Sequence, residues 1–118
     1  MSEQKNILKG YRVLDFGRYI AGPFCGALLS DFGAEVIRVE RVKGSEDRFT
    51  TPVSDKEDGS MFLQMNRNKL GFTLNPMKSE GKKIIAKLTK TADVVIANLP
   101  EKTLEAMGLD FESLTKIN

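Results

Sequence analysis

The sequence predicts an α/β protein with a Rossmann-like, mostly parallel sheet and helices on both of its faces. Apolar runs alternate with helix-like segments along the chain, and glycine or proline marks most of the junctions between them. The first strand–helix–strand unit closes within about 30 residues, which is the size of a βαβ crossover. A chain of 118 residues is also about the length of one domain. We therefore expect a single domain over residues 1–118.

The first crossover has a strand on each side of one helix. Residues 11–17 read Y-R-V-L-D-F-G and predict a buried strand that ends at a glycine. A helix follows over residues 23–32, because Pro23 suits a first helical turn and Gly33 suits the position after the last one. Its apolar residues at helical spacing are Phe24, Ala27, Leu28 and Phe32. Residues 34–41 alternate apolar and charged side chains and predict the second strand.

The middle of the chain is less regular. Residues 42–60 contain many turn formers and no sustained periodicity, so we expect a long loop, of a kind that is usually functional or disordered. A short helix or bend over 60–69 and a third strand over 70–75 come next. Residues 79–91 predict an amphipathic helix, and A-D-V-V-I-A-N-L at 92–99 predicts a strand covered on both faces.

Two short helices complete the pattern, one over 100–108 and one over 110–118 with Asp110 as its N-cap. Parallel sheets bind ligands at the carboxyl ends of their strands. We therefore expect one rim to contain the four segments 16–21, 41–44, 74–76 and 98–102.

Composition argues against several functions. The net charge is only +2, from 18 basic and 16 acidic residues, so we expect no nucleic-acid partner. No apolar run approaches the roughly 20 residues that span a bilayer, and the polar start of the chain lacks the core of a signal peptide. We expect no membrane association and a cytoplasmic location. Histidine is absent and cysteine occurs once, so we expect no metal site and no histidine-activated nucleophile.

The first loop, D-F-G-R-Y-I-A-G-P-F-C-G at 15–26, resembles several nucleotide-binding loops but matches neither G-x-G-x-x-G nor a P-loop. Backbone N–H groups near Gly22 and Pro23 are free at a helix N-terminus, where an anion could bind. Tight-turn geometry is the alternative explanation of the same glycines.

Other polar residues have simple structural interpretations. We interpret Asp15 and Asp31 as structural or surface carboxylates and Cys25 as a buried apolar residue. N-R-N-K at 66–69 is either a solvated turn or a contact with an anionic ligand. The lysines of the 79–91 helix are interpreted as a solvated face.

Three stretches together resemble the class III coenzyme A transferase family. They are Y-R-V-L-D-F-G-R-Y-I-A-G-P-F-C-G-A-L-L-S-D-F-G-A-E-V-I-R-V-E-R at 11–41, M-N-R-N-K at 65–69 and G-L-D-F-E-S-L at 108–114. The resemblance extends from Leu8 to Asn118, and V-L-D-F-x-x-x-x-A-G-P followed by G-A-E-V-I-R-V-E is its most specific part. Formyl-CoA and related carboxylate-CoA transferases belong to this family, and α-methylacyl-CoA racemases are its relatives.

The resemblance implies that the first loop lies against coenzyme A. It places Arg18, Tyr19, Ile20 and Ala21 at the thioester end or pantetheine, Arg41 at the adenosine phosphates, Leu74 and Asn75 at the adenine and ribose, and Asn98 near the pantetheine. This sequence departs from the family at Ala106, where an arginine is usual, and at Pro76 and Met77, where a small apolar residue and a lysine are usual. We expect Lys102, which is one helical turn before Ala106, to replace the missing cation.

The implied reaction moves CoA between an acyl-CoA thioester and a free carboxylic acid, with an aspartate as covalent catalyst. That aspartate lies beyond this chain in the family, whose members are several times longer and form interlocked homodimers. We therefore expect an N-terminal CoA-binding segment, part of a larger domain, with no catalytic residue of its own and no activity alone. A racemase-like enzyme, a non-catalytic nucleotide-binding module and a structural fragment without ligand affinity remain alternatives. The acyl donor and acceptor are not indicated.

Overall fold

The sheet contains four strands that all run in parallel. In this computed structural model, which describes residues 6–50, 52–56 and 58–118, the strand order is β3-β2-β1-β4. The strands are β1 (Arg12–Asp15), β2 (Glu35–Glu40), β3 (Leu70–Thr73) and β4 (Val94–Ile96). The order reverses between β1 and β4, as it does in doubly wound sheets. The predicted parallel α/β sheet is therefore confirmed.

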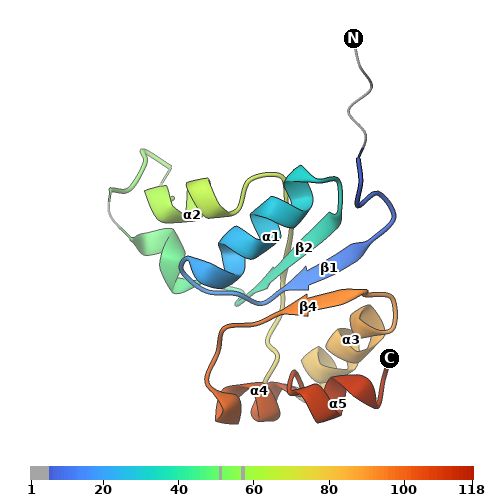
Figure 1. The fold of residues 1–118 in the computed structure, drawn as a ribbon. Helices are drawn as coiled ribbons and strands as arrows, with labels where there is room; N and C mark the ends of the chain where they lie inside the picture. Colours follow the sequence, from blue (N-terminus) through green and yellow to red (C-terminus); the bar gives the residue numbers. More distant parts are fainter. Residues whose placement is uncertain (1–5, 51, 57) are drawn as a thin grey trace.

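Helices cover both faces of this sheet (Figure 1). The helices are α1 (Ala21–Asp31), the 3-10 helix η1 (Glu46–Phe49), α2 (Ser60–Met65), α3 (Ser79–Thr89), α4 (Glu101–Met107) and α5 (Phe111–Thr115). Figure 1 shows α1 and α2 on one side of the sheet and α3, α4 and α5 on the other. The long loop predicted over 42–60 contains η1, together with an isolated bridge between Val53 and Gly59. Asp110 caps α5 as predicted, because its carboxylate accepts the Ser113 backbone N–H at 2.9 Å.

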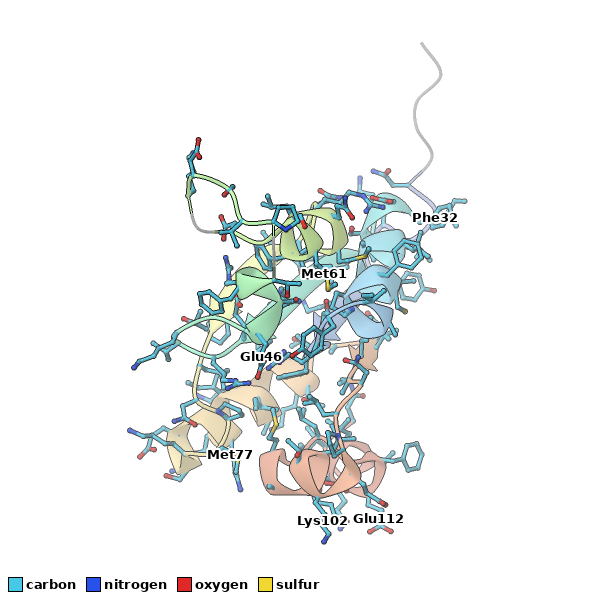
Figure 2. The ribbon with its side chains drawn as sticks, turned by 90° about the vertical axis from the view of Figure 1, so that its left-hand side faces the viewer. Phe32, Glu46, Met61, Met77, Lys102 and Glu112 are labelled. Carbon is cyan, nitrogen blue, oxygen red and sulfur yellow. The ribbon has the colours of Figure 1, made fainter. Side chains whose placement is uncertain are left out.

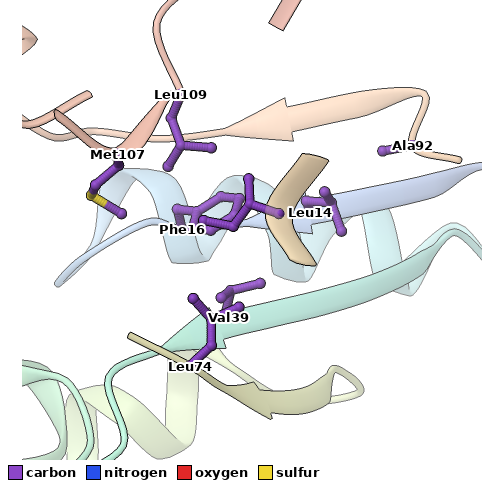
Figure 3. Packing of buried hydrophobic residues seen from close by; sticks show 8 residues of the cluster. Leu14, Phe16, Val39, Leu74, Ala92, Met107 and Leu109 are labelled. Atoms are coloured by element: carbon purple, nitrogen blue, oxygen red, sulfur yellow. The ribbon is translucent and has the colours of Figure 1, made fainter. Parts of the chain in front are cut away.

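Alternation along the strands divides the core between the two faces. Val13 packs with the cluster under α1, whereas its neighbour Leu14 packs with the larger cluster under α3, α4 and α5. Phe16, which is 1% exposed, lies at the centre of the larger cluster, between Met107 and Val39 (Figure 3). The larger cluster therefore joins the end of β1 to α4, which brings these two elements to the same rim.

Helix α1 buries a different face from the one its bulky residues predicted. The residues that it buries are small, namely Gly22, Pro23, Gly26, Ala27 and Ser30. The bulky apolar residues Phe24, Leu28 and Phe32 are 44%, 41% and 53% exposed. Cys25 is also exposed, so the expectation that it is buried was wrong. The small residues lie inward because α1 packs very close to the sheet, where larger side chains have no room.

Strand β4 also differs from the prediction. The sequence predicted a strand at 92–99 that is covered on both faces, whereas β4 has three residues and Val94 is 40% exposed. Because β4 is an outer strand of the sheet, only β1 pairs with it among the described strands. The apolar residues of β4 are therefore only partly buried, instead of being covered on both faces.

Candidate functional site

Three glycines allow β1 and α1 to approach each other closely. A Cβ atom on Gly17 would lie 2.7 Å from Pro23 Cδ and 2.8 Å from the Gly22 carbonyl carbon. A Cβ atom on Gly26 would lie 2.9 Å from Asp15 Oδ2. Cβ atoms do not tolerate such distances, so the glycine spacing in this loop is a packing requirement. The tight approach brings the start of α1 to the carboxyl end of β1.

Asn98 joins the loop after β1 to the loop after β4. Its side-chain oxygen accepts the Arg18 backbone N–H at 2.7 Å, and its side-chain amide donates to the Arg18 carbonyl oxygen at 2.9 Å. The next residue, Tyr19, has φ of +57°, a left-handed conformation that is uncommon outside glycine. Doubly wound sheets bind ligands where the strand order reverses, which here is between β1 and β4. Asn98 fixes the first loop at that point.

A cleft of about 480 Å³ lies at the carboxyl edge of the sheet. Its lining residues come from the loops after β1, β2 and β3, from the segment after β4, and from α4. They are Arg18, Arg41, Val42, Lys43, Gly44, Leu74, Asn75, Pro76, Met77, Leu99, Thr103 and Met107. All four segments that the sequence placed at this rim contribute, so the predicted rim is confirmed.

The cleft combines cations with an apolar surface. Its cations are Arg18, Arg41 and Lys43, which come from the loops after β1 and β2. Its apolar side chains come mainly from the loop after β3 and from α4, and they include Met77 and Met107. The arrangement suits an elongated ligand that has an anionic part and an uncharged part.

Arg18 is the most enclosed of the three cations. Its side chain is 11% exposed, and its guanidinium donates to the carbonyl oxygens of Phe16 and Gly17, both at 2.9 Å. Burial lowers the pKa of Arg18, and the positive charges of Arg38 and Arg41 lower it further. A neighbouring anion would offset that repulsion.

The structure brings together some of the residues that the sequence assigned to the site. Arg18, Arg41, Leu74 and Asn75 line the cleft, and Asn98 adjoins it through its bonds to Arg18. The remaining predicted residues are exposed and do not line the cleft, namely Tyr19, Ile20, Ala21 and Lys102.

Helix α4 turns Thr103 and Met107 toward the cleft rather than Lys102. Thr103 and Met107 are four residues apart, so they share a helical face, and Met107 is 5% exposed. Figure 2 shows Lys102 near Glu112 on the outer side of the molecule, away from Met77. The role of Lys102 toward a ligand stays a prediction. Helical periodicity in residues 101–107 is the signal that could have indicated Thr103 and Met107.

Sequence reasoning also missed lining residues in the loops. Lys43 and Gly44 fall within the predicted 41–44 segment but were not singled out, and Met77 was noted only as a departure from the family pattern. Leu99 likewise follows β4 within a predicted rim segment. The predicted strand ends identified the loops that line the cleft. Which side chains of those loops face the cleft depends on the tertiary packing.

A buried network of charges supports the loops behind the cleft. Lys69 Nζ lies 2.7 Å from Asp15 Oδ2, and these side chains are 1% and 0% exposed. Lys69 and Arg38 both donate to Asn66 Oδ1, at 2.9 and 2.7 Å, and Arg38 also pairs with Asp47 at 2.8 Å. Residues 66–69 therefore supply internal partners, and interpreting Lys69 as a solvated turn residue or a ligand contact was wrong.

A larger hollow, of about 720 Å³, lies at the amino-terminal edge of the sheet. Gly10, Arg12, Glu35 and Leu70 are among its lining residues, and Arg12 is paired there with Glu35. None of the predicted site residues lines it. Ligands of parallel sheets bind at the opposite edge, so the smaller cleft is the candidate site.

Two further properties apply to the part of the chain that the structure describes. Within residues 6–50, 52–56 and 58–118, no group of three histidine, cysteine, aspartate or glutamate side chains is arranged to hold a metal ion. The helices of the same residues are too short or too polar to cross a membrane.

The fold and cleft define a doubly wound α/β protein with a cleft at its carboxyl edge that is lined by cations and apolar side chains. A family model described as CoA-transferase family III matches residues 8–118. The chain belongs to this family.

Curated relatives agree with the family. The chain is 37% identical over 126 residues to an acyl-CoA transferase from Fusarium pseudograminearum, in a match covering 99% of this chain and 28% of that protein. It is 39% identical to human succinyl-CoA:glutarate CoA-transferase, covering 98% of this chain and 27% of the relative. It is 36% identical to (R)-2-hydroxy-4-methylpentanoate CoA-transferase from Clostridioides difficile, covering 92% and 28%. The chain thus spans less than a third of the length of these relatives.

Solved structures show the same fold. A CAIB/BAIF family protein from Brucella suis superposes with a TM-score of 0.86 at 37% identity, covering 94% of this chain and 30% of that one. The protein Rv3272 from Mycobacterium tuberculosis gives a TM-score of 0.84 at 38% identity, with the same coverage of 94% and 30%.

Proposed function

We propose that this chain is the coenzyme A-binding N-terminal segment of an enzyme that moves CoA between an acyl-CoA thioester and a free carboxylate. The observation that carries the proposal is the cleft at the carboxyl edge, which combines cations with apolar side chains in a chain of CoA-transferase family III. Coenzyme A is complementary to such a cleft, because its nucleotide end carries negatively charged phosphates and its pantetheine arm is uncharged.

The nucleotide end of CoA lies at the loops after β2 and β3 in this proposal. Arg41 and Lys43 supply positive charge for the phosphates, and the guanidinium of Arg41 offers the planar pair of donors that a phosphate accepts. Leu74 and Met77 supply apolar surface for the adenine. The pantetheine then runs along the first loop at Arg18, whose position is fixed by Asn98.

The residues of this chain bind and orient CoA, and the proposal assigns them no covalent step. Transfer in the family requires a carboxylate that attacks the thioester. Asp15 does not serve, because it is fully buried, bound to Lys69, and accepts the Gly17 backbone N–H at 2.8 Å. We therefore propose that the 118-residue chain alone is inactive.

Calorimetric titration with CoA tests the binding proposal. At low ionic strength we expect saturable binding, and Arg41→Gln should weaken it about fivefold because a partly exposed phosphate contact is lost. Arg67→Gln is the matched control, since Arg67 is 46% exposed, pairs with Asp31 and does not line the cleft. Absence of binding by folded protein would contradict the proposal.

A CoA-exchange assay tests the proposal that this chain alone is inactive. The chain is incubated with succinyl-CoA and glutarate, the pair named for the human relative. We expect no glutaryl-CoA above the buffer control. Turnover that rises in proportion to the protein concentration would show that this chain holds a catalytic group.

A further inference from the structure

Glu46 lies between the two arginines that line the cleft. Its Oε1 atom pairs with the guanidinium of Arg41, and its Oε2 atom lies 3.8 Å from Arg18 Nε. A carboxylate of the protein itself therefore binds the cations that an anionic ligand would contact.

The local charges explain why a carboxylate is favourable there. Burial and the nearby positive charges of Arg38 and Arg41 destabilise the charged form of Arg18, while the buried carboxylates of Asp47 and Glu40 partly oppose that effect. Glu46 supplies negative charge to Arg18 and Arg41 together, and a carboxylate bridging two guanidinium groups reduces their mutual repulsion. The protein without ligand is thus stabilised by an internal anion.

Glu46 differs from the other acids near these arginines. Asp47 is fully buried and is held by two hydrogen bonds from Arg38. Glu40 is also buried and accepts from Arg48 and from the Ser45 backbone N–H. The Glu46 side chain is 42% exposed, so it can move into solvent at low cost. It is the acid in this region that a ligand can displace.

We propose that Glu46 is an internal competitor of the ligand: in the free protein it pairs with Arg41 and lies beside Arg18, and a phosphate group that binds Arg41 displaces it. This inference rests on the proposed function, in which the cleft takes CoA. Displacement of Glu46 lowers the affinity for every ligand that uses these arginines. A phosphate carries more charge and more acceptor oxygens than a carboxylate, so Glu46 selects phosphorylated ligands over simple carboxylates.

Titrations of wild-type protein and Glu46→Gln with CoA test the inference. At low ionic strength we expect the variant to bind CoA about threefold to tenfold more tightly, and the difference should shrink as salt screens the charges. In an Arg41→Gln background, the gain from Glu46→Gln should be smaller, since one of the two contested cations is gone. Glu112→Gln is the control, because it removes the same charge from an exposed position on α5.

Inorganic pyrophosphate separates this inference from the proposed function. We expect Glu46→Gln to bind pyrophosphate more tightly than wild type, whatever the result with CoA. If the variant gains affinity for pyrophosphate and neither protein binds CoA, the CoA proposal fails and the role of Glu46 stands. Unchanged or weaker pyrophosphate binding would overturn the role of Glu46. Thermal unfolding checks that the variant is folded, and Glu46→Ser must shift affinity in the same direction.

Discussion

Asp15 and Lys69 are 54 positions apart in the sequence, and their charged groups meet in the buried region behind the cleft. Burial lowers the pKa of Lys69, while its hydrogen bond and charge interaction with Asp15 oppose that effect. The sequence analysis interpreted Asp15 as a structural or surface carboxylate and did not indicate its partner. No local pattern encodes a contact between such distant positions, because it depends on how α1 and the segment before β3 pack.

Removing this partner should destabilise the fold. Lys69→Met leaves the Asp15 carboxylate buried without its cation, and we expect a loss of about 3 kcal/mol in the free energy of unfolding. Lys87→Met, at an exposed position on α3, should change it by less than about 0.5 kcal/mol. Chemical denaturation measures both values. If the two variants were equally stable, the buried ion pair would have no structural importance.

The double variant Asp15→Asn with Lys69→Met provides a further check, since it removes both charges. We expect it to lose less stability than the two single changes added together, because neither charge is then left unpaired.

The loop between β1 and α1 shows what sequence patterns reveal about an element and what they omit. Strand ends and the Pro23 and Gly33 signals located α1 to within two residues of its observed start at Ala21. Of the apolar residues that the sequence showed at helical spacing, Ala27 is buried but Phe24 and Leu28 are exposed, because the helix buries its small residues against β1. Hydrophobicity alone does not encode how closely two backbones approach.

A methyl group at Gly22 tests this close packing. The Cβ atom of Gly22→Ala would lie 2.8 Å from Gly17 Cα and 2.9 Å from Asn98 Oδ1. We expect overpacking to lower the free energy of unfolding by about 1–3 kcal/mol. CoA binding should also weaken, because the hydrogen bonds between Asn98 and Arg18 are disturbed. Gly71→Ala is the matched control, since nothing lies within 4 Å of its Cβ position. Equal stability of the two variants in thermal melts would refute the packing account.

The molecule as a whole has apolar surface and sheet edges that its own described residues leave uncovered. Phe24 and Leu28 on α1 and Phe32 directly after it are exposed and four residues apart, which is the spacing of an apolar stripe, and both β3 and β4 are outer strands. Unpaired strand edges and contiguous apolar surface favour association between chains. The homodimer implied by the family resemblance is in keeping with this surface and remains a proposal.

Self-association should therefore increase with concentration. Sedimentation velocity should show species larger than the 13.1 kDa monomer as the protein concentration rises. Leu28→Ser should reduce that association by placing a polar group in the middle of the apolar stripe. A stable wild-type monomer at high concentration would mean that the exposed surface does not promote assembly.

The parallel sheet and its carboxyl rim were predictable from the sequence because they follow from the alternation of strands and helices. The positions of several individual side chains at the cleft were not predictable, since Lys43, Glu46 and Met77 acquire their places only when the loops fold together. Location of CoA at this rim is accordingly the claim on which the other functional proposals depend.

Amide chemical-shift mapping of ¹⁵N-labelled protein titrated with CoA tests that location most directly. We predict saturable shifts at residues lining the cleft, with Gly44, Leu74, Met77 and Thr103 as reporters. The amides of Gly10, Tyr11 and Asn68, which line the hollow at the opposite edge, should not move. Shifts confined to that opposite edge, or no shifts at saturating CoA in folded protein, would contradict the account.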